Sequence, residues 1–487
     1  MTYETIIGLE VHTQLLTRSK MFCRCSADYA NAPPNTHVCP ICLGMPGVLP
    51  TINRRAVEYT VMTALALNCT IPQFTKFDRK NYPYPDLMKG YQISQYDAPI
   101  SVQGRILLET EGEKRQVNIR RVHLEEDVAK LVHRTSSFGE SYSLIDVNRS
   151  GVPLMEIVTE PDFRSPEEAR HFLMKLRTIL QYLGVSTGNM EEGSFRCDAN
   201  ISIRPTGSPE TFAKVEVKNM NSFKAVYRAL EFEANRQRKV AGEGGRLAQE
   251  TRGWVEEKGI TQPQRSKESA HDYRYFPEPD LPPLILSPAW VEETRSSLPE
   301  LPESRRDRFM SQYGLPLYDA NILTNSKALA DYFETCLRLS QDAPLEKSAK
   351  RVSNWLLGDF AHWLNSADIE IHQSKVAPSH LAELLDMTDR SIISGPAAKK
   401  VFEEMFRTGK GPKEIAAQLG LGQISGTSAV EQVVREIIAA NTQAVVDFKA
   451  GKEQALTFLV GQAMRATRGR ANPKLVSEIL QKELERV

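Results

Sequence analysis

The sequence predicts an α+β protein: an amino-terminal antiparallel sheet with helices packed on one face, followed by an all-helical domain and a helical tail domain. Apolar and polar residues alternate in several segments of the first 294 residues, as in strands with one buried face. Beyond residue 295, apolar residues recur at helical spacing instead. A chain of 487 residues has room for about three domains.

Three polar-apolar stretches predict the sheet. In "IGLEVHTQL", Glu10 and His12 alternate with the apolar Leu9 and Val11. The alternation continues in "SFRCDANISIR" and "KVEVKNMNSF", whose polar positions include Arg196, Asp198, Arg204, Glu216 and Lys218. A solvated face of an ordinary antiparallel sheet would produce the same pattern. Repeated Glu, Asp, His and Arg, in place of Thr and Lys, favour a functional face.

Two helices are expected within the sheet region. In "SPEEARHFLMKLRTILQYLG", Ser165 is the expected cap, Pro166 the first helical residue and Gly184 the stop, with Glu168 completing a capping box. A second helix follows Ser222. The proline-rich segment 276–302 and the break "RTGKGP" then divide the chain into predicted domains 1–294, 295–407 and 408–487.

The densest group of reactive side chains is a cysteine cluster. Four of the seven cysteines lie between residues 23 and 42: Cys23, Cys25, Cys39 and Cys42. Two close pairs of thiolates are typical of a structural Zn²⁺ site, in which four ligands leave no open position for a substrate. The alternatives are free thiols in a loop, or a redox C-x-x-C motif, which would require a βαβ context.

The composition and the amino-terminal sequence limit which partners and which cellular compartment we expect. Lysine and arginine balance aspartate and glutamate, 61 against 61, so a charged partner must meet a local patch. The amino terminus has no signal-peptide pattern and no run of about 18 apolar residues occurs, so we expect a cytoplasmic protein without a membrane segment.

Carboxylates accumulate beside the predicted polar strands. "VHLEEDVAK" contains Glu125, the strand-like stretch "PLMEIVTE" contains Glu156, and "GNMEEGSFR" contains Glu191 and Glu192. Carboxylates with one imidazole suit Mg²⁺ or Mn²⁺, which bridge protein carboxylates and nucleotide phosphates. Basic side chains between them would neutralise a transferring phosphoryl group, so phosphoryl transfer is the favoured reaction class. The sequence has neither a P-loop nor a dinucleotide-binding glycine motif.

Two further stretches mix aromatic and charged residues: "FDRKNYPYPDLMKGYQISQ" and "QRSKESAHDYRYFPEPDLPP". They are typical either of a surface that binds nucleotide or nucleic acid, or of well-ordered loops.

These motifs, together with "NRSGVPLMEIVTEPD" and "FLVGQAMRATRGRANPKLV", resemble the B-subunit family of aspartyl/glutamyl-tRNA amidotransferases along the whole chain. The resemblance implies a catalytic cradle similar to that of glutamine synthetase. It also implies a heterotrimer in which the other members are an amidase and a small third subunit. The expected reaction is ATP-dependent phosphorylation of the side-chain carboxylate of Glu-tRNA(Gln) or Asp-tRNA(Asn), then amidation with ammonia from glutamine. Met88 and Gln264 depart from the family pattern, which affects only expected loop geometry.

The resemblance also assigns residues. Expected Mg²⁺ ligands are Glu10, His12, Glu125 and Glu156, with Glu191, Glu192 and Asp198 as further candidates. Expected to face the ATP phosphates are Arg196, Arg204, Lys218, Arg265 and Lys267. The lining of an ammonia channel is expected from Arg79, Lys80, Tyr82, Asp86 and Lys89, with Glu125 as the gate that accepts a proton. The residues expected to act in catalysis are Glu125, Glu10, Arg196 and Lys218.

The tail is expected to contact tRNA through Arg465, Arg468, Arg470 and Lys474. Residues 410–487 hold 11 Lys and Arg against 8 Asp and Glu, a modest basic excess that also fits a solvated helix end. Two alternatives remain: a non-catalytic, zinc-stabilised tRNA-binding scaffold, and the archaeal E-type relative. The continuous helical stretch from about 303 to 405 leaves no room for the domain inserted in the latter.

Overall fold

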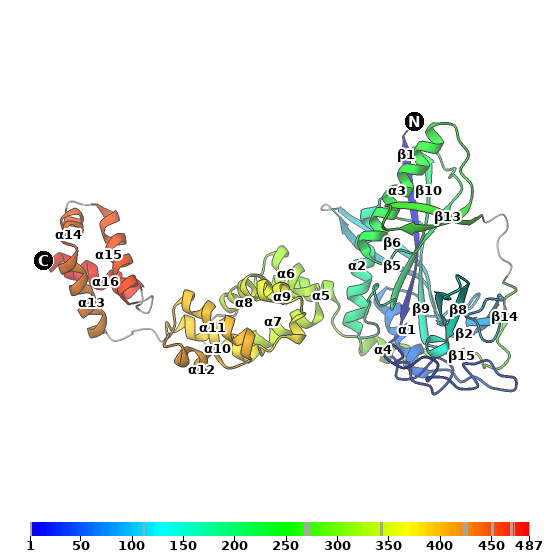
Figure 1. The fold of residues 1–487 in the computed structure, drawn as a ribbon, viewed down its shortest axis with the longest axis horizontal. Helices are drawn as coiled ribbons and strands as arrows, with labels where there is room; N and C mark the ends of the chain where they lie inside the picture. The colour runs from blue at the N-terminus through cyan, green and yellow to red at the C-terminus, as the bar shows by residue number, and fades with distance from the viewer. Residues whose placement is uncertain are drawn as a thin grey trace. The chain divides into compact units, whose positions relative to one another are not determined.

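The structure is a computed structural model that describes residues 2–110, 113–266, 273–340, 344–421, 427–449, 452–467, 471 and 473–486. The chain separates into two compact units, Met1–Leu301 and Pro302–Val487. Every described strand lies in the first unit, whereas the second unit is built from helices (Figure 1). The α+β prediction is therefore confirmed.

The elements follow one another along the chain as two sets. The strands are β1 (Tyr3–Gln14), β2 (Phe74–Thr75), β3 (Asp78–Asn81), β4 (Tyr91–Ser94), β5 (Ser101–Thr110), β6 (Glu113–Glu126), β7 (Lys130–Thr135), β8 (Ser141–Asp146), β9 (Pro153–Thr159), β10 (Phe195–Pro205), β11 (Val215–Lys218), β12 (Glu250–Val255), β13 (Ile260–Ser266), β14 (Phe276–Pro277) and β15 (Leu284–Ile285). The helices of the first unit are α1 (Arg54–Ala66), α2 (Pro166–Leu183), α3 (Phe223–Gly242) and α4 (Pro288–Ser296). Those of the second unit are α5 (Pro302–Tyr313), α6 (Leu317–Thr324), α7 (Lys327–Leu339), α8 (Leu345–Trp355), α9 (Ala361–Ala367), α10 (Pro378–Asp389), α11 (Gly395–Thr408), α12 (Pro412–Gln418), α13 (Thr427–Ala440), α14 (Thr442–Lys449), α15 (Glu453–Ala466) and α16 (Pro473–Arg486).

The main sheet has eight strands in the order β13-β12-β11-β10-β1-β9-β6-β5. Its pairs are antiparallel, as expected, except β11 and β12, which run parallel. The reason is the connection: α3 lies between β11 and β12, and a helical crossover returns the chain in the same direction. The sheet is therefore mixed.

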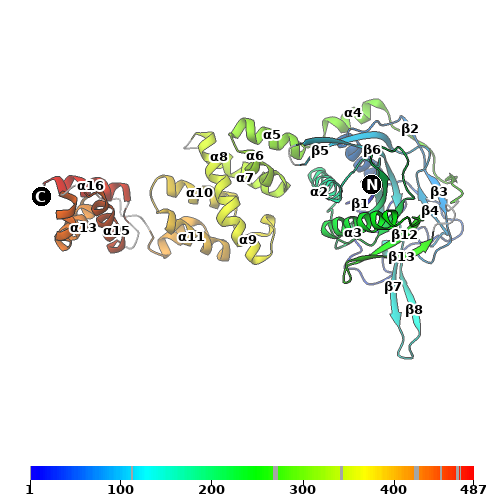
Figure 2. The same cartoon turned by 90° about the horizontal axis from the view of Figure 1, so that it is seen from above.

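The helices α2 and α3 cover one face of the sheet (Figure 2). Helix α2 has the predicted ends, because the Ser165 side chain accepts a hydrogen bond from the Glu168 amide and Gly184 adopts a φ of 67°. The Glu168 carboxylate accepts from the amide of Arg164, one residue before the cap, so the predicted capping box is displaced. Apolar side chains of both helices pack on the apolar strand face, which leaves the opposite face to the polar residues.

A smaller sheet joins the two stretches that mix aromatic and charged residues. It has the order β14-β3-β4, with Phe276 opposite Arg79 and Lys80 opposite Gln92. The side chain of Gln92 donates to the main-chain carbonyl of Glu126, at the end of β6. The two segments, far apart in the sequence, therefore form one ordered layer beside the main sheet.

The second unit contains two apolar cores. One extends from Phe309 to Ala416 and the other from Val430 to Leu484. Helix α12 belongs to the first of these cores, because Ile415 and Ala416 are buried in it. The first compact unit in turn extends to Leu301, beyond the proposed boundary at 294, because Leu298 and Leu301 pack on its core.

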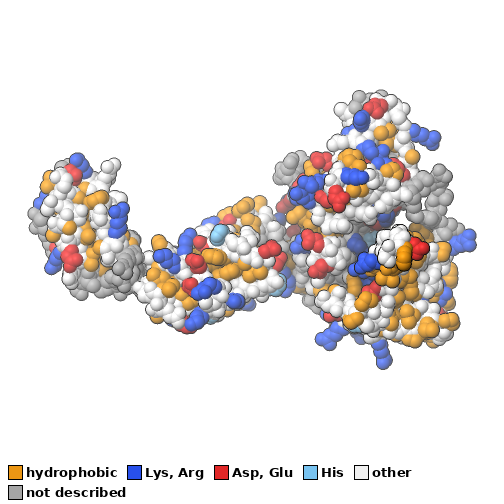
Figure 3. All heavy atoms as spheres, viewed as in Figure 1, with side chains coloured by type: hydrophobic (Ala, Val, Ile, Leu, Met, Phe, Trp, Pro, Cys, Tyr) orange, Lys and Arg blue, Asp and Glu red, His pale blue; other side chains and the backbone are white. Residues whose placement is uncertain are grey.

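The surface is of mixed charge. Basic and acidic side chains are interspersed on the face drawn in Figure 3, in keeping with the equal numbers of both in the sequence. Among the described residues, no helix has the combination of length and apolar character that crossing a membrane requires.

Candidate active site and metal centre

The polar face of the main sheet carries one row of side chains across four neighbouring strands. Arg196 of β10 pairs with His12 of β1, which pairs with Glu156 of β9. Glu156 in turn pairs with His123 of β6. Residues directly opposite on antiparallel strands point to the same face, so the register places these four side chains next to one another.

Three of the predicted ligands converge at this row: His12 and Glu156, which belong to it, and Glu125, two residues after His123 on β6. His12 Nε2 lies 3.5 Å from Glu156 Oε2 and 3.8 Å from Glu125 Oε1. Both carboxylates are buried, and Ser94 Oγ donates to Glu125 Oε2 at 3.1 Å. One ligand atom from each of the three residues lies within 4.8 Å of the others. Ligands of one octahedral ion with bonds of about 2.1 Å are separated by about 3.0 to 4.2 Å, so these spacings suit a small cation.

The charges of this cluster depend on one another. Burial alone would raise the pKa of Glu156, but the imidazoles of His123 and His12 lower it well below its ordinary value. Burial would lower the pKa of His12, but the carboxylates of Glu156 and Glu125 raise it to about 9. Without a cation, the His12 imidazolium is therefore the positive charge that the two carboxylates hold between them.

A second acidic group adjoins the first along the strands. Glu10 pairs with Asp198 across β1 and β10, and Asn200 Nδ2 donates to Glu10 Oε1 at 2.9 Å. Lys218 Nζ lies 2.5 Å from Asp198 Oδ2 and 3.2 Å from Glu216 Oε1. Burial raises the pKa of Glu10, and the neighbouring carboxylates raise it further. Glu10, Asp198 and Lys218 thus share the polar face with the His12 cluster but lie outside its three-residue group.

Arg196 is held by an internal carboxylate. Its Nη2 donates to Asp127 Oδ2 at 2.9 Å, and the same oxygen accepts from Gln14 Nε2 at 2.7 Å. Burial would raise the pKa of Asp127, but the guanidinium groups of Arg196 and Arg149 keep it below its ordinary value. The ion pair fixes Arg196 at the end of the row, where its exposed part is available to an anion.

Other predicted residues are not brought into the row. Arg204 lies eight positions beyond Arg196 on β10, about 26 Å along the strand at roughly 3.3 Å per residue, and pairs with Glu4 at 2.8 Å. Glu191 and Glu192 are exposed in the turn before β10, and their amides donate to Asn189 Oδ1.

The remaining basic candidates lie in β13 and the tail. Arg265 lies in β13, where its backbone pairs with that of Thr251 in β12. Lys267 lies outside the described residues. In the tail, Arg465 is exposed on α15 and the backbone of Lys474 belongs to α16. Arg468 and Arg470 lie outside the described residues.

The predicted channel residues surround the small sheet. Arg79 donates two hydrogen bonds of 2.7 Å to the Glu278 carboxylate. Lys80 Nζ lies 5.7 Å and 5.0 Å from the ring centres of Tyr82 and Tyr273. Burial would lower the pKa of Lys80, but Glu125 and other acidic groups raise it, so Lys80 is a cation held near the carboxylate cluster.

The other two channel candidates lie on the loop that follows Tyr82. Burial raises the pKa of Asp86, whose Oδ1 is buried with no hydrogen-bond partner among the described residues. Lys89 Nζ contacts Glu126 Oε1 at 2.5 Å, and the same oxygen accepts from the Ile93 amide. Glu126 directly follows Glu125 in the chain, so this loop contacts the immediate neighbour of a residue in the carboxylate cluster.

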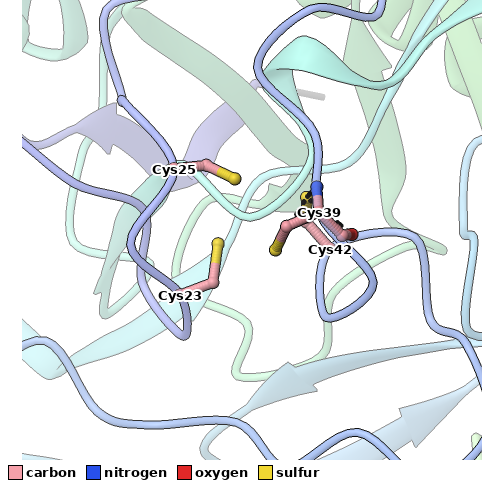
Figure 4. A group of neighbouring side chains, drawn as sticks. All are labelled: Cys23, Cys25, Cys39 and Cys42. Atoms are coloured by element: carbon pink, nitrogen blue, oxygen red, sulfur yellow. Dashed lines mark hydrogen bonds between the residues drawn. The ribbon is translucent and has the colours of Figure 1, made fainter.

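The four cysteines point their sulfur atoms at a common centre (Figure 4). The Sγ atoms of Cys39 and Cys42 are 3.8 Å apart, and the Cys39 amide donates to Cys42 Sγ. Tetrahedral Zn²⁺ with bonds of about 2.3 Å separates its sulfur ligands by about 3.8 Å, so the geometry fits the ion. The side-chain hydrogen bond between Cys23 and Cys42 raises the pKa of Cys23 and lowers that of Cys42 to about 4, while burial raises the pKa of Cys25 to about 11.

The cysteine segment also contacts the loop that carries the predicted channel residues Asp86 and Lys89. Gly44, two residues after Cys42, has a φ of +67°, and a Cβ there would lie 2.6 Å from Lys89 Cγ and 3.0 Å from its Cα and N. A cavity of about 220 Å³ lies at this contact, lined by residues that include Cys42, Gly44, Lys89 and Glu126. The segment that follows Cys42 thus supports the main chain of Lys89.

One residue of the row was missed from the sequence. No role was predicted for His123 of "VHLEEDVAK", although it lies two positions before Glu125 and so shares a strand face with it. That spacing was the available signal. The pairing with Glu156 was not available, because the register between β6 and β9 includes an irregularity after Ile119.

Two family models match the chain: the GatB/GatE catalytic domain over residues 5–292 and the GatB domain over residues 331–484. The first match covers the eight-stranded sheet from residue 5 onward, including the row of polar side chains. The fold and the site therefore define a catalytic subunit with a GatB/GatE-type domain.

Full-length relatives narrow this class. The chain is 58% identical to the B subunit of an aspartyl/glutamyl-tRNA(Asn/Gln) amidotransferase from Dehalococcoides mccartyi (strain CBDB1), over 99% of each chain. It is 53% identical to the protein of the same name from Thermoanaerobacter pseudethanolicus, over 100% of both chains. For Moorella thermoacetica the identity is 54%, over 99% of this chain and 100% of the relative. The chain belongs to the family of aspartyl/glutamyl-tRNA(Asn/Gln) amidotransferase B subunits.

Proposed function

We propose that the first unit activates the side-chain carboxylate of a mischarged Glu-tRNA(Gln) or Asp-tRNA(Asn) with ATP and then amidates it. The observation that carries this proposal is the cluster of the partly exposed His12 with the buried Glu125 and Glu156 on the polar face of a catalytic-domain sheet. A carboxylate repels nucleophiles and has no good leaving group. Transfer of the γ-phosphoryl group to it releases ADP and gives an acyl phosphate, from which ammonia displaces phosphate.

The cluster fits Mg²⁺ by its donors and spacing. His12, Glu125 and Glu156 would hold the ion, and Glu10 and Asp198 are the nearest further carboxylates. When bound, Mg²⁺ neutralises phosphate charge and orients the nucleotide. Of the basic candidates, Arg196 and Lys218 lie on the same strand faces as these carboxylates, which favours them for phosphate contacts. The ion pairs with Asp127 and Asp198 keep both cations oriented before a nucleotide arrives.

The nitrogen is supplied from outside this chain. We infer that a separate amidase hydrolyses glutamine, that a small third protein completes a heterotrimer, and that ammonia reaches Glu125 past the loop of Tyr82, Asp86 and Lys89. Two observations support a polar route there: Asp86 Oδ1 is buried without a hydrogen-bond partner among the described residues, and Lys89 pairs with the buried Glu126. Cys69, Cys197 and Cys336 are buried, and burial raises each thiol pKa, which disfavours a glutaminase nucleophile among them.

The cysteine cluster is proposed as a structural Zn²⁺ site, and the tail as a tRNA contact through Arg465 and its basic neighbours. Four sulfur atoms that lie within 4.8 Å of one another, with those of Cys39 and Cys42 3.8 Å apart, support the first proposal. The exposure of Arg465 on α15 supports the second. Because its substrates are aminoacyl-tRNAs, the complex is proposed to act in the cytoplasm.

The test is ATP hydrolysis by the reconstituted complex in the presence of mischarged tRNA. We expect Glu125→Gln and Glu156→Gln to lower this hydrolysis by at least about a hundredfold, the scale of losing a group that stabilises the transition state. Glu210→Gln changes an exposed carboxylate with no proposed role and is the matched control. Full hydrolysis in the Glu125 and Glu156 variants would support a tRNA-binding scaffold instead. Amidation assays with each mischarged tRNA would then establish the substrate.

A further inference from the structure

His123 occupies the inner end of the row on β6. It is 2% exposed, and its Nε2 lies 3.1 Å from Glu156 Oε2. Its Nδ1 is buried and has no hydrogen-bond partner among the described residues. A buried imidazole without a hydrogen bond is costly, so the contact with Glu156 is the interaction that compensates its burial.

The contact also defines which ring nitrogen donates. A carboxylate oxygen accepts hydrogen bonds, so the short approach of Nε2 to Glu156 places the proton on Nε2. Glu156 then lies between two imidazoles, His123 from β6 and His12 from β1. Both imidazoles lie near both carboxylates, since His123 Nε2 is also 3.9 Å from Glu125 Oε2, but His123 is buried and closer to Glu156, whereas His12 is partly exposed.

We propose that His123 is a positioning residue that holds the Glu156 carboxylate toward His12 and Glu125. The inference rests on the proposed cation site and adds a residue to it. The 3.1 Å contact of Nε2 with Oε2 restricts the orientation of a side chain with three rotatable bonds, so that Glu156 presents its oxygen before the cation binds. Partners of this kind behind metal ligands typically contribute 10- to 100-fold in metal affinity.

The test compares two substitutions in the full reconstituted complex. His123→Leu removes the donor and fills its place with an apolar side chain, whereas His123→Gln keeps an amide donor near the position of Nε2. We expect His123→Leu to raise the dissociation constant for Mn²⁺, measured by titration calorimetry, by 10- to 100-fold and His123→Gln to restore most of the affinity. His133→Leu changes an exposed histidine on β7 and is expected to leave Mn²⁺ binding unchanged.

A double variant separates positioning from general loss of structure. If His123 acts through Glu156, adding His123→Leu to Glu156→Gln weakens Mn²⁺ binding no further. An unchanged dissociation constant in a folded His123→Leu complex would overturn this inference and leave the proposed function intact. Failure of the unmodified complex to bind Mn²⁺, together with full ATP hydrolysis by Glu125→Gln, would overturn both.

Discussion

Substituting Gly44 by alanine tests whether the cysteine segment holds the loop that carries Asp86 and Lys89. The new Cβ would lie 2.6 Å from Lys89 Cγ and 3.0 Å from Lys89 Cα and N. The side-chain carbon can rotate away, but the main-chain atoms cannot. Since ordinary carbon contacts begin near 3.5 Å, the main chain of Lys89 must move by about half an ångström or more.

The expected magnitude has two parts. The left-handed conformation of Gly44, with a φ of +67°, costs a non-glycine residue about 1–2 kcal/mol, which lowers stability. Displacement of Lys89 also shifts its contact with Glu126, the residue that follows Glu125. Misplacement of a reacting group by about 1 Å can cost a hundredfold in rate, so we expect a ten- to hundredfold loss in ammonia transfer.

The assay is amidation with two nitrogen donors in the reconstituted complex. Glutamine requires the proposed route past Lys89, whereas ammonium chloride at high concentration reaches the site from solvent. We expect Gly44→Ala to slow the glutamine-driven reaction strongly and the ammonium-driven reaction little. Gly47→Ala is the matched control, because Gly47 also has a positive φ of +83° but has nothing within 4 Å of an added Cβ.

Two results would refute this reasoning. Equal losses with glutamine and with ammonium would mean that Gly44→Ala damages the active site or the fold, not the route. A similar glutamine-specific loss in Gly47→Ala would mean that backbone strain in the segment, and not the contact with Lys89, causes the effect.

Three further predictions concern stability and tRNA. Cys39→Ser should lower zinc content, measured by metal analysis, together with the melting temperature; lost amidation at an unchanged melting temperature would contradict a structural role. Ending the chain after Leu421, which keeps α12 on its core, should weaken tRNA binding in a filter assay without altering the first unit; unchanged affinity would exclude the tail as a contact. Burial would raise the pKa of Glu334, but hydrogen bonds from Arg308, Arg305 and Tyr313 lower it from 4.5 to about 2. Because this pKa is depressed in the folded state, the ionised carboxylate stabilises the fold above pH 4.5, and this stabilisation is lost as pH falls toward 2. Glu334→Gln should therefore abolish a stability difference of about 2 kcal/mol between pH 6 and pH 3, measured by urea unfolding; an unchanged pH dependence would exclude the ion pair as its cause.

The local signals in the sequence were the reliable ones. Alternation predicted the polar faces of β1 and β10, and the residues at both ends of α2 predicted its bounds, because each depends on neighbours in the chain. The alternation of polar and apolar residues also identified the strand face that carries Arg204. It could not show how far along the strand Arg204 lies from the site. The long β1–β10 pairing therefore separates Arg204 from His12, although both are polar residues of adjacent strands.

Features set by pairing between distant segments could not be predicted. The parallel alignment of β11 and β12 follows from where α3 returns the chain, and the pairing of His123 with Glu156 depends on a register. The contact of Gly44 with Lys89 depends on how two loops pack. In each case several arrangements satisfy the same local pattern, and tertiary packing selects one of them.

The row across four strands has a consequence for how the protein can vary. Its members come from β10, β1, β9 and β6, so each side chain reaches the site only if three independent strand alignments are kept. Deleting or inserting a single residue within any of these strands would turn a ligand to the helix-covered side, even though every ligand remained in the sequence. Insertions and deletions in this family should therefore be confined to the connections between these strands. A sequence that keeps every motif residue can still lack the site.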